Sequence, residues 1–356
     1  MQTSYLNSDV ILLLKDISGQ VKYFSVEERE KLSKRGFHYS NMLPIERIPS
    51  KECVCLYKDL LKIYSKRTAI AIAKISEKIV KERGTNFVIV SLIRAGVSIG
   101  ILIKHYMEKK YNVILPHYAV SIIRGKGIDK NAIEYILSHH NPSSIQFVDG
   151  WTGKGTIYHE LKNSIVNYEN VSSELAVLSD PAGITKLCAT HMDILIPNAC
   201  LNATISGLIS RTFYSKKINK KYDYHGAVYY ENFKSSDLTY DFITNIERHF
   251  NCIGDCTNCD LNDKIPVNPG INEVKTISNC FELDNINLVK PGIGETIRTL
   301  LKRVPWQIII TKNAQNNADI RYIIRLAKEK KVKTSFYPLT IYRSCALIKR
   351  GYAENI

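Results

Sequence analysis

The sequence contains no long apolar run. The longest one near its start, Val10–Leu14, is flanked by the acidic residues Asp9 and Asp16. A signal-peptide core needs about 7–15 apolar residues and a membrane-spanning helix about 20. We therefore expect a soluble protein that stays in the cytoplasm and has no membrane partner.

The cysteines lack the spacing of a disulfide framework. The chain has nine of them, an odd number, and seven are scattered. A reducing compartment is the simpler expectation. No internal repeat or low-complexity tract stands out. With 356 residues, 45% of them hydrophobic, the chain is long enough for two domains with cores of their own.

Acidic residues are scarce towards the end of the chain. The net charge of the whole sequence is +15, and residues 288–356 alone hold fourteen Lys/Arg against four Asp/Glu. This asymmetry predicts a polyanionic partner for the C-terminal part, nucleic acid before membrane. A basic surface that is merely solvated is the alternative, and charge alone does not separate the two.

Apolar segments of strand length alternate with helical patterns in residues 1–250. Such alternation predicts a parallel α/β sheet covered by helices on both faces. The expected helices are Thr68–Arg83, a segment that follows Gly96 and runs to about Met107, and Asn131–His139. The expected strands are Phe87–Leu92, Val113–Val120, Ile145–Val148 and Glu174–Leu178.

Residues 251–285 are rich in Cys, Asn and Asp, and this composition predicts a connector. A small α/β unit is expected over residues 286–356, with a turn and helix at Lys290–Leu301, strands at Trp306–Ile310 and Lys333–Tyr337, and a basic helix at Asp319–Lys331. The connector contains a CxxxCxxC run whose thiolates are ligand types for zinc or an iron–sulfur cluster. Its members are Cys252, Cys256 and Cys259, with Cys280 a candidate fourth ligand. Because two separated CxxC pairs would be a much stronger signal, metal binding there stays open.

The segment Ser144–Tyr158 (SIQFVDGWTGKGTIY) predicts a phosphate site. An apolar strand leads to Asp149, then to a turn of small residues and a helix start. Glycines let backbone N–H groups converge, and a helix N-terminus attracts anions. The expected phosphate-binding residues are Thr152, Gly153, Lys154, Gly155 and Thr156. A Walker-type P-loop is excluded because Val148 stands where its first glycine is required. An ordinary strand–turn–helix junction is the alternative.

Two further loops follow predicted strands. One contains Arg94, Ala95 and Gly96; the other, Ser121–Asp129, places Arg124 and Lys126 among glycines, as suits a mobile cationic flap. Because the carboxyl ends of parallel strands meet at one edge of a sheet, all three loops should face one ligand. A ligand with two separated phosphate groups and a hydroxylated sugar between them would fit.

These motifs resemble those of the type I phosphoribosyltransferases. The signature of that family is an apolar run, an acidic pair and a small-residue loop ending in Gly-Thr, here IQFVDGWTGKGT, and LIRAG (Leu92–Gly96) resembles its pyrophosphate loop. The resemblance implies that Thr152–Thr156 bind the 5′-phosphate of phosphoribosyl pyrophosphate, Asp149 the ribose hydroxyls, and the Arg94 loop with Arg124 and Lys126 the pyrophosphate. It also implies that the activity depends on Mg²⁺. We assign no side chain of this sequence as a ligand of that metal. The sequence departs from the pattern at Gly150, where the family has its second acid.

A longer resemblance covers nearly the whole chain. HYSNMLP, VSLIRAGVSIG, HYAVSIIRGKGID, VDGWTGKG and DYHGAVYY resemble a bacterial family associated with tellurite-resistance and stress gene clusters. Its members are described as predicted phosphoribosyltransferases, and some carry a cysteine protease label. The sequence does not favour proteolysis. Cys53 and Cys55 have no adjacent glycine turn or helix start to activate them, and no Cys–His motif is recognisable.

The C-terminal unit resembles the Pelota-type RNA-binding domain. The matching segments are KPGIGETIRTLLKR (Lys290–Arg303), a glycine turn leading into an RNA-contacting helix, and Asp319–Val332. The family usually has Asn where Gly294 stands. The expected RNA-binding residues are Lys290, Gly292, Gly294, Glu295, Arg298, Lys302 and Arg303. The helix N-terminus and the cations could hold phosphates, and Glu295 could accept from a base edge. A basic docking or dimerisation module is the alternative.

The sequence therefore predicts a Mg²⁺-dependent phosphoribosyltransferase fused to an RNA-binding domain. Its partners would be phosphoribosyl pyrophosphate, an acceptor that cannot be read from the sequence, and RNA, with a homodimer left open. Asp180, His225 and Tyr229 are candidates to line the acceptor pocket. The alternative is a non-catalytic sensor of a nucleotide or sugar phosphate that presents the RNA-binding domain, and Gly150 is the feature that favours it.

Overall fold

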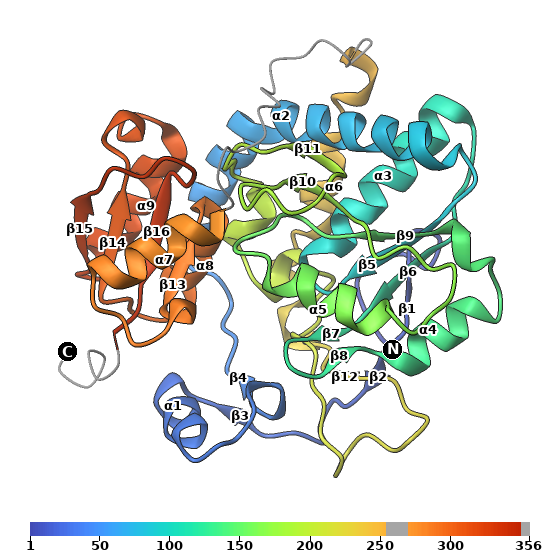
Figure 1. Ribbon diagram of the computed structural model, residues 1–356, viewed down its shortest axis with the longest axis horizontal. Helices are drawn as coiled ribbons and strands as arrows, with labels where there is room; N and C mark the ends of the chain where they lie inside the picture. Colours follow the sequence, from blue (N-terminus) through green and yellow to red (C-terminus); the bar gives the residue numbers. More distant parts are fainter. Residues whose placement is uncertain (254–269, 350–356) are drawn as a thin grey trace.

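A parallel sheet of six strands forms the centre of the N-terminal domain (Figure 1). The computed structural model describes residues 1–253 and 270–349. All five neighbouring pairs in the sheet are parallel. The spatial order is β1 (Ile11–Leu12), β6 (His117–Val120), β5 (Val88–Leu92), β9 (Ile145–Val148), β10 (Leu175–Ser179) and β11 (Cys188–Thr190).

Helices cover both faces of this sheet, as the alternating pattern predicts. One apolar cluster contains α2 (Lys51–Arg83), α3 (Ala95–Tyr111) and α6 (Thr239–Glu247), and the other contains α4 (Lys130–Leu137) and α5 (Thr156–Ile165). The expected fold class is confirmed. Among the described residues, no helix combines the length and the apolar character that a membrane crossing requires.

Helix α2 is much longer than the predicted Thr68–Arg83. It begins after Ser50, whose side chain accepts a hydrogen bond from the Cys53 N–H at 3.3 Å, and it ends at Gly84. Buried residues from Tyr57 onwards continue the helical spacing towards the N-terminus. Cys53 and Cys55 therefore lie in the first turns of a helix, so the expectation that no helix starts there was wrong.

Short elements complete the N-terminal domain. They are β2 (Lys15–Asp16) with β12 (Gly226–Ala227), β3 (Tyr23–Phe24) with β4 (Leu43–Pro44), the hairpin of β7 (Ile122–Ile123) and β8 (Gly127–Ile128), and helix α1 (Val26–Lys34). Turns of 3₁₀-helix occur at Tyr39–Asn41, Pro142–Ser144, Pro197–Cys200 (η3), Ala203–Ile205, Glu231–Ser236 and Phe250–Cys252.

The C-terminal domain is a mixed four-stranded sheet between helices. The order is β13 (Val289–Pro291), β16 (Ser344–Leu347), β14 (Gln307–Ile310) and β15 (Lys333–Phe336), with β16 antiparallel to both neighbours. Helices α8 (Ile293–Lys302) and α9 (Ala318–Glu329) share an apolar cluster with Ile308 and Ile310, whereas α7 (Gly270–Cys280) packs with Ile309. Side chains of successive β14 residues thus pack on opposite faces of the sheet. In the described part of this domain, further 3₁₀ turns lie at Ile286–Leu288 and Lys312–Ala314.

Part of the expected connector is ordered as helix. Helix α7 lies within residues 251–285, and its Val274 and Ile277 are fully buried in the core of the C-terminal domain. The packing of this domain therefore begins by Gly270, ahead of Ile286, because apolar residues at helical spacing continue through the Asn-rich segment.

The two domains are packed against each other. The apolar cluster on the α2 face of the large sheet continues into Ile293, Ile297 and Leu300 of α8. Helix α8 lies beside η3 of the N-terminal domain. The face of the C-terminal domain that carries α8 is therefore turned towards the large sheet (Figure 1).

Candidate functional site

The predicted ligand loops meet at one edge of the large sheet. Strand β5 leads through α3 to β6 on one side, whereas β9 leads through α5 to β10 on the other. The strand order therefore reverses between β5 and β9, and open α/β sheets bind ligands at such a point. A cavity of about 580 Å³ lies here, between the two domains.

The turn Thr152–Thr156 lines this cavity at the start of α5. Gly155 adopts a φ of +87° at the N-cap, a conformation that favours glycine. The free N–H groups of the first turn of α5 thus lie beside the cavity, as an anion site requires. The side chain of Thr152 is not free to donate, because its hydroxyl donates to Asp180.

Lys154 bridges the phosphate loop to the C-terminal domain. Its Nζ donates to the carbonyl oxygens of Ile286 at 2.9 Å and Val289 at 3.3 Å. Burial, together with the nearby charges of Lys290 and Arg124, lowers the pKa of Lys154 to about 7. An anion in the cavity would favour the protonated form.

Asp149 follows β9 and lines the same cavity. Its Oδ1 accepts a hydrogen bond from the Gly150 N–H at 2.7 Å. Burial raises the pKa of Asp149 to about 7, which the Gly150 N–H and Arg298 oppose and Glu295 reinforces. Its half-buried carboxylate can therefore accept hydroxyl groups of a ligand, and it is ionised most fully above neutral pH.

The Arg94 loop differs in part from expectation. Arg94 and Ala95 line the cavity, but Arg94 Nη1 forms an ion pair with Glu46 Oε1 at 2.9 Å and donates to the Ile209 carbonyl oxygen. Gly96 does not line the cavity. A Cβ at Gly96 would lie 2.5 Å from the Val148 oxygen, so this glycine allows α3 to pack on β9. Glu46 was missed because nothing in its local sequence indicates Arg94 as a partner.

The expected flap is the β7–β8 hairpin. Arg124 lines the cavity, its N–H donates to the Tyr39 hydroxyl at 2.8 Å, and its Nη1 reaches Asn287 Oδ1 of the C-terminal domain at 3.5 Å. Lys126 instead lies with its Nζ 4.8 Å from the centroid of the Tyr214 ring and is not among the lining residues. The structure therefore brings Arg124 to the cavity and leaves Lys126 outside it.

The N-terminus of α8 is occupied by the N-terminal domain. The carboxylate of Asp193 accepts hydrogen bonds from the Ile293 N–H at 3.0 Å and the Arg343 N–H at 2.9 Å. A Cβ at Gly292 would lie 3.1 Å from Asp193 Oδ1. In this arrangement the helix end expected to bind RNA phosphates binds a carboxylate of the same chain.

Gly294 and Arg298 of α8 pack against Trp151 in the phosphate-loop segment. A Cβ at Gly294 would lie 3.0 Å from the indole, and the Arg298 guanidinium carbon lies 4.5 Å from the centroid of the indole ring. The Tyr342 hydroxyl also donates to the Gly153 oxygen at 2.7 Å. Trp151 thus gives a physical reason for glycine where the Pelota-type family usually has Asn.

The remaining predicted RNA-binding residues also face the N-terminal domain. Lys290, Glu295, Arg298 and Arg303 line the 580 Å³ cavity, and Lys302 lines an adjoining cavity of about 680 Å³. Four of the seven residues expected to contact RNA therefore line the predicted phosphoribosyl site; Gly292 and Gly294 lie against Asp193 and Trp151, and Lys302 lines the adjoining cavity. Sequence patterns could not reveal this, because they do not specify which domain surface packs on which.

The 580 Å³ cavity is strongly cationic. It is lined by eight Lys/Arg side chains and two carboxylates, Asp149 and Glu295; the cations are Arg29, Arg94, Arg124, Lys154, Arg211, Lys290, Arg298 and Arg303. Arg211 was missed by sequence reasoning. Its buried Nε has no hydrogen-bond partner within the described residues, and burial lowers the pKa of Arg211 to about 10. This excess of positive charge suits a ligand with several negative charges.

The three residues proposed to line an acceptor pocket do not line this cavity. Asp180 is fully buried beneath the phosphate loop, and its carboxylate accepts from Thr152, Ile184 and Thr185. His225 Nδ1 lies 2.8 Å from Ser121 Oγ, and the Tyr229 N–H donates to Ser18. Asp180 is thus an anchor of the loop.

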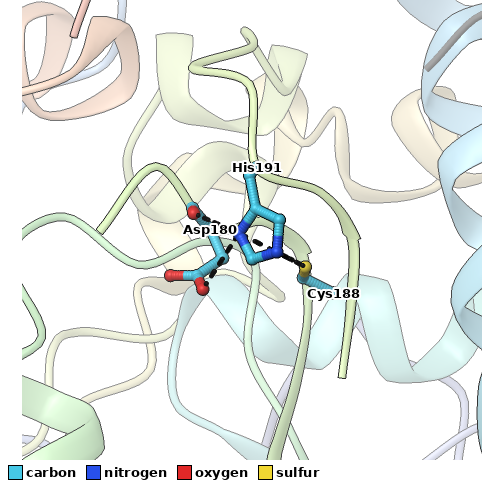
Figure 2. A group of neighbouring side chains, drawn as sticks. All are labelled: Asp180, Cys188 and His191. Atoms are coloured by element: carbon cyan, nitrogen blue, oxygen red, sulfur yellow. Dashed lines mark hydrogen bonds and ion pairs between the residues drawn. The ribbon is translucent and has the colours of Figure 1, made fainter. Parts of the chain in front are cut away.

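A cysteine and a histidine meet beside this anchor (Figure 2). Cys188 Sγ lies 3.4 Å from His191 Nε2, and His191 Nδ1 lies 3.0 Å from the Asp180 carbonyl oxygen. The expectation that no Cys–His motif exists was wrong: Cys188-Ala-Thr-His191 brings both groups to the end of β11. Cys188 is fully buried and lines none of the three cavities described between residues 1–253 and 270–349.

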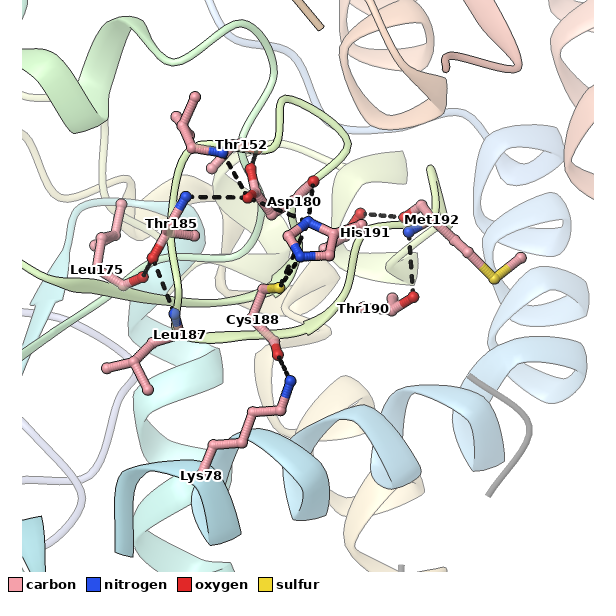
Figure 3. A network of polar contacts seen from close by, with 12 residues as sticks. Lys78, Thr152, Leu175, Asp180, Thr185, Leu187, Cys188, Thr190, His191 and Met192 are labelled. Carbon is pink, nitrogen blue, oxygen red and sulfur yellow. Dashed lines mark hydrogen bonds and ion pairs between the residues drawn. The ribbon is translucent and has the colours of Figure 1, made fainter. Parts of the chain in front are cut away.

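Asp180, Cys188 and His191 are also ligand types for a zinc ion. However, both carboxylate oxygens of Asp180 already accept hydrogen bonds, and the surrounding contacts connect Thr152 to β11 (Figure 3). We therefore assign the group to support of the phosphate loop. Of the cysteines proposed as ligands in the connector, Cys252 and Cys280 are exposed, and Cys256 and Cys259 lie outside the described residues.

Two family models match separate parts of this chain. Residues 3–247 match the family model "Tellurite-like stress resistance cysteine protease StiP", and residues 268–350 match the "PELOTA RNA binding domain". A relative from Acinetobacter baylyi named "Cysteine protease StiP" is 31% identical over 364 residues, covering 98% of this chain and 94% of the relative.

Solved structures are similar at a lower level. A xanthine-guanine-hypoxanthine phosphoribosyltransferase of Helicobacter pylori is 14% identical over 31% of this chain and 69% of its own, with a TM-score of 0.24. A hypoxanthine-guanine phosphoribosyltransferase of Bacillus anthracis is also 14% identical, over 37% of this chain and 73% of its own, with a TM-score of 0.22. Such low scores support no conclusion about activity, whereas the family model and the Acinetobacter relative are decisive: this chain belongs to the StiP family.

Proposed function

We propose that the protein is a phosphoribosyltransferase that uses phosphoribosyl pyrophosphate. The observation that carries this proposal is the 580 Å³ cavity at the β5/β9 switch point, where a glycine-rich turn at a helix N-terminus, the Asp149 carboxylate and an excess of cations converge. A phosphate cradle next to a carboxylate and further cations matches a sugar that carries phosphates at two ends.

Each group has a distinct role in this proposal. The turn Thr152–Thr156 binds the 5′-phosphate, Asp149 accepts from ribose hydroxyls, and Arg94 with Arg124 holds the pyrophosphate. As pyrophosphate leaves, positive charge develops at C1′ while an acceptor attacks. The protein contributes fixed charge and exclusion of water, without a covalent intermediate.

Magnesium dependence is part of the proposal. The carboxylate oxygens of Asp149 and Glu295 on the cavity wall are the hard ligands that Mg²⁺ prefers. Bound Mg²⁺ would neutralise charge on the pyrophosphate leaving group.

The match of residues 268–350 to an RNA-binding domain supports RNA as a partner. Because the α8 face is turned to the phosphoribosyl cavity, RNA that uses this face would approach Lys302 and Arg303 along the adjoining cavity.

Calorimetric titration with phosphoribosyl pyrophosphate, with and without Mg²⁺, tests the proposal. We expect saturable binding that Mg²⁺ strengthens, and loss of pyrophosphate release in Asp149→Asn and Lys154→Ala. Lys162→Ala is the matched control, because Lys162 is exposed on α5 away from the cavity. No binding at millimolar ligand, or equal activity in all variants, would refute the assignment.

A non-catalytic sensor is the second candidate. The phosphate loop contacts the C-terminal domain through Lys154, Gly153 and Trp151, so a ligand on the loop would directly affect those contacts. Gly150, in place of the second acid, also favours binding without turnover. Saturable binding with no pyrophosphate release for any acceptor would support the sensor.

Thiol hydrolysis, which the name of the family suggests, has one supporting observation, the 3.4 Å contact between Cys188 and His191. Full burial of Cys188 opposes it, since a peptide substrate must reach the nucleophile. Cleavage of a casein substrate that is lost in Cys188→Ser would support this function, whereas absence of cleavage would argue against it.

A further inference from the structure

The C-terminal domain brings one acidic side chain to the phosphate loop. Glu295, in the first turn of α8, lines the 580 Å³ cavity together with Asp149. A Cβ built on Gly153 would lie 3.6 Å from Glu295 Cγ. A side chain of one domain thus lies directly beside the turn of the other that is proposed to bind phosphate.

In the parts of the chain described, 1–253 and 270–349, Glu295 interacts with neighbouring cations such as Lys290 and Arg298 only at longer range, through its charge. It is half-buried, yet it makes no hydrogen bond and no ion pair within those ranges. Half-buried carboxylates with a structural role normally have such partners, as Glu46 and Glu77 do here. Glu295 is therefore available to a ligand.

A carboxylate is the wrong charge for a phosphate. In a cavity lined by eight cations, it would weaken phosphate binding unless it accepted hydrogen bonds from hydroxyls or bound a cation that accompanies the ligand. Asp149 has the same chemistry on the opposite domain. Gly150, the next residue, contributes no side chain, so the N-terminal domain supplies a single carboxylate to this cavity.

Contacts between the domains fix the position of Glu295. Asp193 caps the N-terminus of α8, and Gly294 and Arg298, on either side of Glu295 in the helix, pack on Trp151. The carboxylate is therefore presented by a rigid helix seated on the loop, as substrate-positioning groups require.

We propose that Glu295 is the second carboxylate of the ribose site, supplied by the C-terminal domain, and that it accepts hydrogen bonds from the ribose hydroxyls of a phosphorylated ribose opposite Asp149. This inference rests on the proposed function. It makes the C-terminal domain a wall of the ligand site, so that neither domain alone holds a complete one.

Titration of the full chain with three probes tests the inference: ribose 5-phosphate, phosphoribosyl pyrophosphate with Mg²⁺, and inorganic pyrophosphate, which has no ribose hydroxyls. In Glu295→Gln we expect both ribose ligands to bind about 10-fold or more weakly, the range for a lost charge-assisted hydrogen bond. Pyrophosphate should bind equally well or more tightly, because a negative charge has been removed. Asp284→Asn, an exposed acid of the same domain, is the matched control.

The outcomes separate the two proposals. Unchanged affinity of Glu295→Gln for ribose 5-phosphate overturns the role of Glu295 and leaves the proposed function standing. Equal weakening of pyrophosphate also overturns it, since that result indicates a disturbed loop. Failure of the wild-type chain to bind either ribose ligand refutes the proposed function together with this inference. Thermal unfolding of Glu295→Gln and Glu295→Ala verifies that both variants are folded.

Discussion

Two clusters of partly buried charges in this protein differ in how fully they are paired. In the first, His105 Nε2 lies 3.1 Å from Asp9 Oδ1, its Nδ1 contacts Glu247, and Tyr240 also donates to Asp9. In the second, the interdomain cavity, eight cations face two carboxylates. The first cluster ties α3 to α6 and to the start of the chain, and its opposite charges are paired. The second keeps an excess of positive charge, although Arg94 pairs with Glu46 and Lys154 donates to carbonyl oxygens of the C-terminal domain.

The comparison distinguishes a cluster whose opposite charges are paired from a cluster whose excess positive charge an anionic ligand can neutralise. Burial alone would lower the pKa of His105, but Asp9 and Glu247 raise it to about 9. In the cavity, burial lowers the pKa of Lys154 to about 7 and raises the pKa of Asp149 to about 7. Both shifts disfavour the charged form of the side chain. Unfavourable charge that persists around a cavity is a sign of function.

Removing the central member of the paired cluster should have the largest effect on stability. We expect His105→Ala to lower the free energy of unfolding by about 2–3 kcal/mol, because Asp9 and Glu247 are left partly buried without their cation. Urea denaturation at pH 7 measures this, with ribose 5-phosphate affinity as the control that should not change. A stability loss below about 0.5 kcal/mol would mean that the cluster is solvated.

The pH dependence of this loss has a defined sign. Since the folded-state pKa of His105 is about 9 and the ordinary value is 6.5, its stabilisation is fully present below pH 6.5 and is lost as the pH rises through 9. The difference between wild type and His105→Ala should therefore shrink between pH 7 and pH 10.

Removing a cavity cation should reduce ligand affinity much more than it reduces stability. We expect Lys154→Met to change the melting temperature little, because the loss of its hydrogen bonds to the Ile286 and Val289 carbonyl oxygens is offset by the removal of a partly desolvated charge. Affinity for phosphoribosyl pyrophosphate should fall about 10- to 100-fold, as for a lost charge-assisted contact. Calorimetry and thermal unfolding together check this. A destabilised Lys154→Met with full affinity would remove the distinction between the two clusters.

The contact between Gly294 and Trp151 can be tested by overpacking. Gly294→Asn should destabilise the chain by about 1–2 kcal/mol, because even a Cβ would lie 3.0 Å from the indole. Adding Trp151→Ala should recover part of the loss, and a double-mutant cycle measures this coupling. Additive effects would show that the two residues do not constrain each other.

The smallest expected effect is on the pH profile of ligand binding. Ribose 5-phosphate affinity should rise severalfold from pH 6 to pH 7 as Asp149, which faces Arg298 and Glu295, ionises. It should fall again above pH 7 as Lys154, which faces Lys290 and Arg124, loses its proton. The ligand's own phosphate, whose second pKa is about 6, also contributes to this rise in affinity. Asp149→Asn should remove the part of the rise that the phosphate does not explain. A profile unchanged in that variant would contradict the role of Asp149.

The sequence by itself determined the local elements of the site. The apolar run Ile145–Val148 is β9 with the predicted bounds, and the glycine turn leads into α5 at Thr156. Strands β14 and β15 and helix α9 also lie where apolar periodicity placed them. These features depend on short-range patterns and on the backbone freedom of glycine, which are readable within about fifteen residues.

Only the tertiary structure decided which of these groups meet. Glu46 forms an ion pair with Arg94, and Asp193 accepts a hydrogen bond at the N-terminus of α8. Glu295 lies beside Gly153. Strand β16, Ser344–Leu347, was missed because it obtains its stability from pairing with β13 and β14, which precede it by more than thirty residues in the sequence. Each of these contacts joins residues that are far apart in the chain. They depend on the shape and charge complementarity of packed surfaces, and a local sequence pattern contains no information about that complementarity.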